Sequence, residues 1–465
     1  MYPSWPATEF LTSVFGISIQ ASTKKTNALF GVHWKRIILD EAHVIKNPKA
    51  ATSVGICQLK ADHRWGLTGT PIQNELKDFY SLIRFIGLAP FDDYRVWKDT
   101  VEKRGSVGMQ RLDTVVSSLV LRRTKLEVET LKLPQRMVEY HQLSFSLEEQ
   151  VIYDVLFAAA RRVFCNYLQQ QGEHFQPLEN QESATLQALS KMDEPVRKAV
   201  FSILLPFQAQ ITAAKSRSVL TLLLRLRQCC GHLSLLVSAI KRGEAEEELD
   251  LDLQMGALTL DGNDSESQEP AKPPDVALFS RDRTSTKVIE VMNQLKRIRE
   301  QDVPGQPPCK SVIVSQWVSM LDIFEAHLRK GGFSTIRIDG TVPPQKRLEC
   351  VKTFNSPGQD PSVMLLSLQA GGVGLNLVGG NHVFIVDMHW NPALEEQAAD
   401  RCHRMGQKRD VYIHRFVCRG TMEEQIVRLQ EKKLKLSNAV LSGGSKKTAN
   451  NKLSLSDLKY LFDIK

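Results

Sequence analysis

Five short apolar runs in the carboxyl-terminal third of this 465-residue chain constrain its fold more than any other feature. They are the expected strands 311–315, 335–338, 363–368, 383–386 and 411–416, and segments of helical periodicity separate them. Strands that alternate with helices form a parallel sheet, because each helical crossover returns the chain to the same end of the sheet. The sequence therefore predicts an α/β domain over residues 285–441, which we expect to fold alone.

A second α/β region is predicted over residues 31–130. Expected strands near Ile37 and Leu67 come before a helix whose apolar side chains recur at helical spacing. These side chains are those of Leu76, Phe79, Tyr80, Ile83 and Ile86. We assign them to a core, with no chemistry implied.

Two carboxylates, Asp40 and Glu41, close the apolar run 34–39. A short apolar run that ends in acids is typical of a buried strand with the acids at its carboxyl end, where ligands bind in open α/β sheets. One carboxylate there can hold Mg²⁺ through water, and its neighbour can orient or deprotonate an attacking water. The alternative is a pair of simple turn residues.

Two arginines, Arg401 and Arg404, follow Gln397 at a spacing of three residues. On a helix this spacing places both guanidinium groups on one face. Such a pair suits a triphosphate that loses its terminal phosphoryl group, because arginine is always charged and offers a rigid fork of donors. The alternative is a solvated basic helix end.

Glycine-rich segments follow two further apolar runs, at 67–74 and 367–377. Glycine lets the backbone approach a phosphate closely, although one such loop alone is weak support for a nucleotide site. Together with the acidic pair and the arginine pair, these segments resemble, in order and separation, the helicase motifs of the SNF2 family of DNA-dependent ATPases.

The resemblance covers roughly residues 31–441 and extends to other segments. These are Lys46-Asn47, 121–125, 224–230, Ser315-Gln316-Trp317 and Trp390-Asn391-Pro392. Segments 229–233 and 387–390 are similar to the Lodestar type, a group of ATP-dependent RNA polymerase II termination factors. The resemblance implies an α/β fold of two RecA-like lobes with parallel sheets, the first lobe incomplete, plus helical protrusions.

The resemblance also implies roles for individual residues, with ATP and Mg²⁺ between the two lobes. Asp40 would hold Mg²⁺ through water, Glu41 would orient water, and Arg401 and Arg404 would be arginine fingers. The implied ATP-binding residues further include Gly372, Gly374, Asn376 and Gln397. Those implied to bind DNA or to couple it to the nucleotide are Thr68, Gly69, Thr70, Gln73, Gln316 and Trp317. Trp317 could equally be a core residue.

Charge favours a polyanionic partner, although a solvated basic surface is the alternative. The net charge is +8, but residues 244–275 carry eleven acids and one lysine, so the rest of the chain carries +18. The resemblance implies duplex DNA as the partner, RNA polymerase II complexes or chromatin as further partners, and a nuclear location. The eight cysteines form no CxxC pair, so we expect no zinc-binding RING and no zinc.

No membrane span is expected either. Residues 361–386 lack charged side chains but contain five glycines, two asparagines and a histidine, which favours strand, loop, strand.

The remaining segments complete the expected domain organisation. Residues 1–30 are unassigned, and 131–242 form an inter-lobe crossing near Val138 and Tyr140 followed by long helices at 147–170 and 216–240. Residues 243–284 form an acidic disordered linker, because acids, serine and proline dominate without apolar periodicity. Residues 442–465 form a basic stretch and a short helix at 456–462.

Three smaller expectations concern single side chains. Thr421 and Glu424 have the spacing of a capping box at the start of a helix. His43 links motifs across the cleft rather than binding a metal, and His403 lies on the surface.

One departure bears on activity. P-loop ATPases need a glycine-rich loop that ends in Gly-Lys-Ser/Thr, and this chain contains no Gly-Lys dipeptide. Either the sequence is a fragment or incomplete gene model of a longer ATPase, which we favour, or it is a shortened product. We therefore expect a DNA-dependent ATPase that translocates on duplex DNA, with a non-hydrolysing DNA-binding or interaction protein as the alternative. The 465-residue chain itself should not hydrolyse ATP, and its first lobe should expose apolar faces.

Overall fold

The computed structural model describes residues 28–69, 76–103, 105–121, 133–170, 172, 190, 192–200, 216–237, 277–302, 305, 307–358, 360–371, 374–441 and 455–464. The chain divides into two compact units. The first unit comprises residues 1–122 and 435–451, and the second comprises residues 123–434 and 452–465. Each unit has its own hydrophobic core.

The first unit is built on two parallel strands, β1 (His33–Leu39) and β2 (Lys60–Gly66). Its helical elements are η3 (Ala28–Gly31), η4 (Ala42–Ile45), α1 (Ala51–Cys57), α2 (Leu76–Ile86), α3 (Tyr94–Trp97), η5 (Lys98–Glu102) and α4 (Gly105–Leu119). The predicted strands and the predicted helix α2 are confirmed, with Phe79 and Ile83 buried as expected. On the opposite side of the strands, Ile38 and Trp65 are register partners and are 63% and 61% exposed, so the predicted apolar exposure is confirmed.

The second unit is built on a six-stranded sheet, β3 (Arg136–Leu143), β4 (Ser311–Ser315), β5 (Thr335–Ile338), β6 (Val363–Ser367), β7 (His382–Ile385) and β8 (Val411–Cys418). The strand order is β3-β8-β7-β4-β6-β5, and every pair is parallel. The predicted α/β fold with a parallel sheet is therefore confirmed. The central strands read as continuous apolar runs because helices cover both faces of the sheet.

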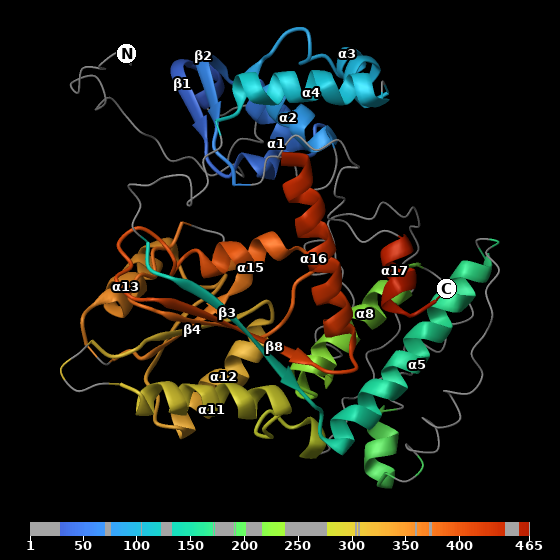
Figure 1. The fold of residues 1–465 in the computed structure, drawn as a ribbon, viewed down its shortest axis with the longest axis vertical. Coiled ribbons are helices and arrows are strands. Elements are labelled where there is room, and N and C mark those ends of the chain that lie inside the picture. The colour runs from blue at the N-terminus through green and yellow to red at the C-terminus, as the bar shows by residue number, and fades with distance from the viewer. Residues whose placement is uncertain are drawn as a thin grey trace. The chain divides into compact units, whose positions relative to one another are not determined.

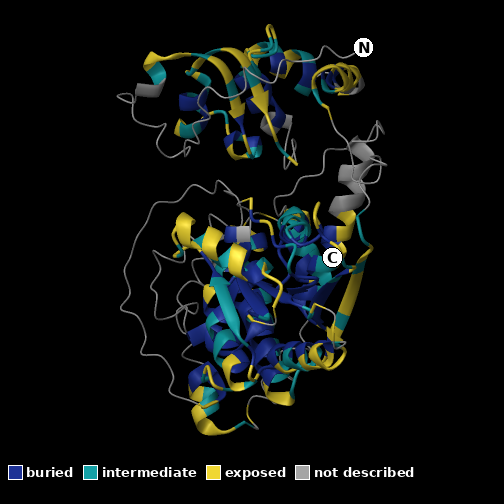
Figure 2. Cartoon of the chain, turned by 90° about the vertical axis from the view of Figure 1, so that its left-hand side faces the viewer, coloured by how far each residue is buried: buried dark blue, intermediate teal, exposed yellow. Residues whose placement is uncertain are grey.

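Helices of the second unit flank this sheet on both faces. They are α11 (Thr286–Glu300), α12 (Val318–Lys330), α13 (Pro344–Asn355), α14 (Leu368–Gly371), α15 (Pro392–Ala399) and α16 (Met422–Leu441). Figure 1 shows α11 and α12 on one side of the strands and α13 and α15 on the other. Figure 2 shows that buried residues concentrate in the strands, whereas exposed residues lie mainly on the outer helices and loops.

The segment predicted as a crossing between lobes is instead an edge strand of this sheet. Strand β3 pairs with β8 along its whole length, from Arg136 opposite Val411 to Leu143 opposite Cys418. The prediction was wrong because the alternation of apolar residues in β3 indicates an extended backbone but does not indicate that β8 is its partner.

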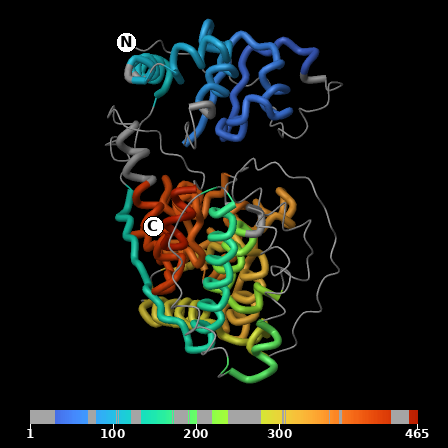
Figure 3. Tube along the Cα trace, turned by 90° about the vertical axis from the view of Figure 1, so that its right-hand side faces the viewer, coloured from blue at the N-terminus to red at the C-terminus, as the bar shows by residue number. Residues whose placement is uncertain are grey.

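Two long helices follow β3 and join the same core. They are α5 (Leu147–Gln170), with the predicted bounds, and α8 (Ser216–Gly231). These helices pack against each other, as Figure 3 shows, and their buried side chains belong to the core cluster of the sheet. The terminal helix α17 (Leu455–Leu461) adds Leu458 and Leu461 to that cluster. Residues 285–441 are thus only part of a folded unit, and we now expect the larger unit rather than this segment to fold alone.

The described part of the expected acidic linker is ordered. Residues 277–279 form η6 (Ala277–Phe279), and Leu278 and Phe279 are buried. Arg283 forms an ion pair with Glu148 at 2.6 Å. Leu278 and Phe279 belong to the core of the second unit, so the second lobe begins before residue 277. Residues 238–276 lie outside the described residues.

Among the described residues, no helix is both long enough and apolar enough to cross a bilayer. The charge-free stretch 361–386 contains β6 and β7, so the prediction of strand, loop, strand is confirmed.

Candidate functional site

The carboxyl end of β1 carries Asp40 and Glu41. Glu41 has φ 48° and ψ 48°, a left-handed conformation that costs a non-glycine residue of the order of 1–3 kcal/mol. Its backbone N–H donates to Asp40 Oδ1 at 2.9 Å. The turn therefore holds two carboxylates at the end of a strand in a conformation that the chain does not adopt by local preference.

His43 connects this turn to the segment after β2. Its Nδ1 atom lies 3.3 Å from Glu41 Oε2 and 3.4 Å from Thr68 Oγ1. Burial lowers the pKa of His43, while the Glu41 carboxylate opposes that shift. The imidazole thus joins the acidic turn to Thr68 within the first unit, whereas the predicted link across the cleft stays a prediction.

The backbone holds the same two segments together. Leu67 N–H donates to Leu39 O and Ala42 N–H donates to Leu67 O, both at 2.8 Å. Gly66 at the end of β2 packs closely on this turn, because a Cβ atom there would lie 3.3 Å from Ala42 Cβ. Gly69 is exposed at the end of this segment, and the other two predicted coupling residues, Thr70 and Gln73, lie outside the described residues.

In the second unit, Arg401 and Arg404 lie beyond the end of α15 rather than on a helix. The helix ends at Ala399, and the chain then turns so that Cys402 is fully buried. The predicted helical placement of both arginines is wrong, because beyond Asp400 the backbone N–H groups bond to carbonyls three residues back, Arg401 to Ala398 O and Cys402 to Ala399 O, which forms a turn rather than an α-helix. Arg401 is partly buried and Arg404 is exposed.

The turn after α15 is tied to the predicted glycine-rich segment. Leu377, which follows Asn376 in the chain, donates its N–H to Arg401 O at 2.9 Å. Gly374 and Asn376 are exposed, and Asn376 O accepts a bond of 2.8 Å from Asn355 Nδ2. The structure thus brings Arg401 close to Asn376. Gly372 lies outside the described residues, and Gln397 is partly buried on α15.

Gln407 is a positioning residue that the sequence analysis did not single out. Its buried Nε2 donates to Gly380 O at 2.8 Å and to Cys402 O at 3.1 Å. Its Oε1 accepts from Lys408 N at 2.9 Å and from Arg409 N at 3.0 Å. One side chain therefore fixes the turn that carries both arginines. The only sequence signal for this role was its position three residues after Arg404.

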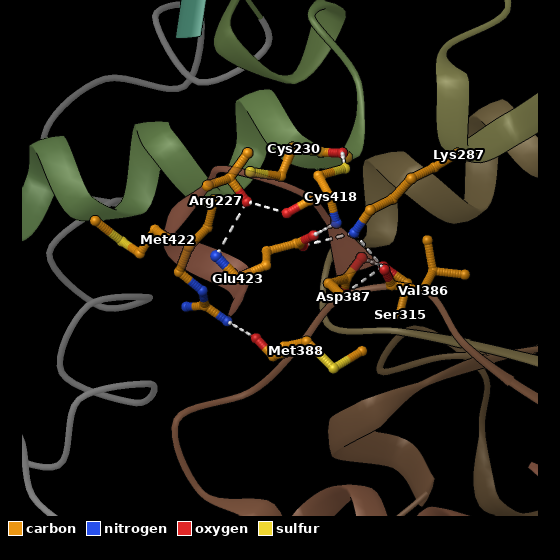
Figure 4. Close-up of polar contacts among 12 residues, drawn as sticks. Arg227, Cys230, Lys287, Ser315, Val386, Asp387, Met388, Cys418, Met422 and Glu423 are labelled. Carbon is orange, nitrogen blue, oxygen red and sulfur yellow. Dashed lines mark hydrogen bonds and ion pairs between the residues drawn. The ribbon is translucent and has the colours of Figure 1, made fainter. Parts of the chain in front are cut away.

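A buried arginine lies beneath the carboxyl ends of β4 and β7. Arg227 of α8 donates from Nη2 to Gln316 Oε1 at 2.6 Å and to Met388 O at 2.8 Å, and Figure 4 shows the bond to Met388. Its guanidinium lies 4.8 Å from the Trp390 ring and 5.8 Å from the Trp317 ring. Burial lowers the pKa of Arg227 to about 10, and Asp387 opposes that shift. Trp317 is only 5% exposed, which favours its core alternative.

Several donors of this cluster have no hydrogen-bond partner in the described part of the chain. They are Arg227 Nη1, Gln316 Nε2, Trp317 Nε1 and Trp390 Nε1. Buried donors without acceptors are costly, at about 1–3 kcal/mol each.

A buried ion pair between Lys287 and Glu423 lies beside Arg227 (Figure 4). Lys287 Nζ donates to Glu423 Oε1 at 2.5 Å and to Val386 O at 2.7 Å. Asp387 accepts from Ser315 Oγ at 3.0 Å and from Gln316 N at 2.7 Å. Burial raises the pKa of Asp387, and the Lys287 cation opposes it. These contacts lock α11 and α16 to the strand ends.

Three other histidines have partners that the sequence could not reveal. His403 is 8% exposed and its Nε2 lies 2.9 Å from Pro134 O, so the predicted surface location is wrong. The segment before β3 covers it. His232 Nε2 lies 2.8 Å from Arg283 O, and His389 Nδ1 accepts from Asn391 N at 3.0 Å.

Comparison with known proteins adds two family matches. Residues 9–235 match the SNF2-related domain, and residues 290–406 match the helicase conserved C-terminal domain. Together the two matches span the turn with Asp40 and Glu41 and the turn with Arg401 and Arg404.

Curated relatives match almost the whole chain. Transcription termination factor 2 of Drosophila melanogaster is 36% identical over 95% of this chain, which spans 45% of that protein. The probable global transactivator of Orgyia pseudotsugata multicapsid polyhedrosis virus is 30% identical over 95% of this chain and 72% of its own length. A solved Sulfolobus solfataricus SWI2/SNF2 ATPase core in complex with dsDNA is 23% identical, with a TM-score of 0.40, over 96% of this chain and 76% of its own.

Proposed function

Since this chain belongs to the SNF2 family of helicase-related ATPases, we propose that it hydrolyses ATP to move along duplex DNA and displace bound complexes. The observation that carries this proposal is the link from Glu41 through His43 to Thr68, at 3.3 and 3.4 Å. Glu41 contacts His43, and His43 contacts Thr68 in the segment after β2. DNA bound at that segment could therefore shift the Glu41 carboxylate through His43.

We assign roles to the acidic turn on chemical grounds. Asp40 is an exposed carboxylate at a strand end, which fits the oxygen ligands that Mg²⁺ prefers, and Mg²⁺ would neutralise phosphate charge there. Glu41 would orient the attacking water. Its left-handed backbone holds the carboxylate beside His43.

The arginines and the loop beside them supply the other half of the proposed chemistry. Arg404 is exposed and can reach a phosphate, and Gln407 keeps its turn in place. Arg401 lies on the same turn, next to Asn376 through the Leu377 backbone bond. We assign both arginines as fingers, and Gly372, Gly374, Asn376 and Gln397 as nucleotide contacts.

Duplex DNA is the proposed partner. The charge of +18 outside residues 244–275 favours a polyanion. We assign Thr68, Gly69, Thr70, Gln73 and Gln316 to DNA binding or coupling. The fruit-fly relative is named a transcription termination factor, so stalled RNA polymerase II complexes in the nucleus, or chromatin, are the proposed targets.

A second candidate function rests on the absence of a Gly-Lys dipeptide from the chain. A phosphate loop supplies several charge-assisted hydrogen bonds, each of about 1.5–3 kcal/mol. Without such a loop the protein would bind DNA or a partner without hydrolysis.

One experiment separates the two candidates. Phosphate release and DNA binding are measured on the 465-residue chain and on a longer chain that places a Gly-Lys-Thr loop before it, each with and without duplex DNA. We expect DNA-stimulated hydrolysis only in the longer chain, abolished by Glu41→Gln with nucleotide affinity retained. DNA binding should weaken steeply with salt in both chains. Hydrolysis in neither, or DNA binding that ignores salt, would contradict the translocase proposal.

A further inference from the structure

The sheet of the second unit brings His414 together with Glu139 and His141, which lie 275 and 273 residues before it in the chain. Glu139 and His141 are alternate residues of β3, so they share one face of the sheet. His414 of β8 is the register partner of Glu139. We propose that Glu139, His141 and His414 form a binding site for a divalent transition metal, with Zn²⁺ as the best match.

The distances between the three ligand atoms fit a tetrahedral ion. His141 Nε2 and His414 Nδ1 are 3.0 Å apart, and Glu139 Oε2 lies 3.2 Å from His414 Nδ1 and 3.8 Å from His141 Nε2. Zinc bonds of about 2.0–2.2 Å to nitrogen and oxygen separate neighbouring tetrahedral ligands by about 3.3–3.6 Å. The observed separations bracket that value, so small adjustments of the side chains suffice.

The ligand types select the metal. Two imidazoles and one carboxylate suit Zn²⁺, whereas Mg²⁺ and Ca²⁺ prefer sites made of oxygen ligands alone. Three protein ligands leave a fourth position, which water can fill. The Glu139 side chain is 47% exposed, so an ion can enter from the edge of the sheet.

A second layer of contacts holds the ligands in place. His414 Nε2 lies 3.1 Å from His382 Nδ1, so His382 can accept its proton and leave His414 Nδ1 free for the metal. The His141 ring stacks on Phe416, and the His414 ring stacks on Phe384, each with centroids 4.7 Å apart. These aromatic contacts restrict both imidazoles before any ion binds.

This proposal departs from the sequence-based expectation of no zinc. That expectation rested on the absence of CxxC pairs, which concerns cysteine sites. A ligand set drawn from two strands far apart in sequence has no spacing signature. The competing explanation is a hydrogen-bonded row of metal-free imidazoles from His141 through His414 to His382.

The test uses the full 465-residue chain, freed of metal with EDTA and then titrated with Co²⁺ as a spectroscopic probe and with Zn²⁺ in competition. Tetrahedral Co²⁺ with nitrogen and oxygen ligands absorbs in the visible range, and thiolate ligation by the cysteines would add strong near-ultraviolet bands. Glu139→Gln and His141→Ala remove ligands. His33→Ala is the matched control, because His33 and Asp62 form an exposed pair at 3.6 Å that has no third ligand among the described residues.

We expect one Co²⁺ per chain in a tetrahedral site, displaced by Zn²⁺ and without thiolate bands. Both ligand variants should lose this site while His33→Ala keeps it. His382→Gln should weaken Zn²⁺ binding by about 10- to 100-fold, as loss of an outer contact does. Melting of each metal-free variant near the parent temperature shows that the fold survives.

Two results would overturn the proposal. One is the absence of saturable Zn²⁺ and Co²⁺ binding by the parent chain, which would establish the metal-free row of imidazoles. The other is tetrahedral binding that folded Glu139→Gln and His141→Ala variants retain, which would place the ion elsewhere.

Discussion

Lys287 and Glu423 illustrate how single charged residues hold the second unit together. Both are almost completely buried, at 0% and 2% exposure. Burial lowers the pKa of Lys287, but the Glu423 carboxylate raises it further, so the net shift is upward and the lysine stays charged. The pair connects α11 to the start of α16. Its value lies in mutual compensation, because either charge alone would be buried without a counterion.

Glu423→Gln should therefore destabilise the protein by about 3–5 kcal/mol, since it leaves the Lys287 cation without its partner. The double variant Lys287→Met with Glu423→Leu should be markedly more stable than the single variant. Urea unfolding of the three proteins measures both effects. A double variant less stable than Glu423→Gln would show that shape rather than charge compensation dominates here.

Arg404 should act on the transition state rather than on the bound substrate. Arg404→Ala is expected to lower turnover by about 10³-fold or more with little change in the Michaelis constant, because a finger stabilises charge that develops during phosphoryl transfer. Arg404→Lys should rescue poorly, since lysine lacks the planar fork. Steady-state ATPase kinetics in a longer chain with a phosphate loop provide the measurement. A loss of affinity alone would make Arg404 a ground-state contact.

At the scale of elements, the start of α16 shows a variation on the predicted capping box. Thr421 Oγ1 accepts from Glu423 N at 3.2 Å, as an N-cap should, and donates to Cys418 O at 2.7 Å. Glu424 Oε2 accepts from Gly420 N at 3.2 Å rather than from the Thr421 N–H. The cap is confirmed, but its glutamate bonds one residue earlier, because Gly420 has φ 67° and turns its N–H toward the helix.

Thr421→Ala should cost about 1 kcal/mol, since it removes the oxygen that satisfies a free N–H of the first turn. Thr353→Ala is the matched control, because Thr353 Oγ1 only donates to Glu349 O within α13. Thermal unfolding of both variants gives the comparison. Equal losses would argue that the cap contributes nothing specific.

At the scale of the molecule, the second unit is larger than the lobe that the sequence outlines. Strand β3, helices α5 and α8, and helix α17 all contribute buried side chains or backbone pairing to the six-stranded sheet. Removal of β3 would leave β8 as an open edge, and removal of α5 and α8 would expose their apolar partners.

Residues 133–464 should accordingly unfold in one cooperative transition, whereas residues 285–441 should aggregate or melt without cooperativity. Expression of both fragments, followed by size-exclusion chromatography and thermal melting, tests this boundary. Cooperative unfolding of the shorter fragment with the stability of the longer one would show that β3 and the helices are dispensable.

The sequence by itself determined the elements whose signals are local. Strands β4 and β5 and helix α5 have their predicted bounds, because apolar periodicity and chain direction depend only on neighbouring residues. The acidic turn, the arginine motif and the family were also readable from short segments. Prediction of these elements therefore required no knowledge of the packing.

Only the tertiary structure decided which segments meet. The pairing of β3 with β8, the contact of His403 with Pro134 and the cluster of Glu139, His141 and His414 each join residues more than 260 positions apart. Helix α15 ends at Ala399, so neither arginine lies on the helix that their spacing predicts. Register and burial are properties of the whole packed chain, and no local pattern records a partner that distant in sequence.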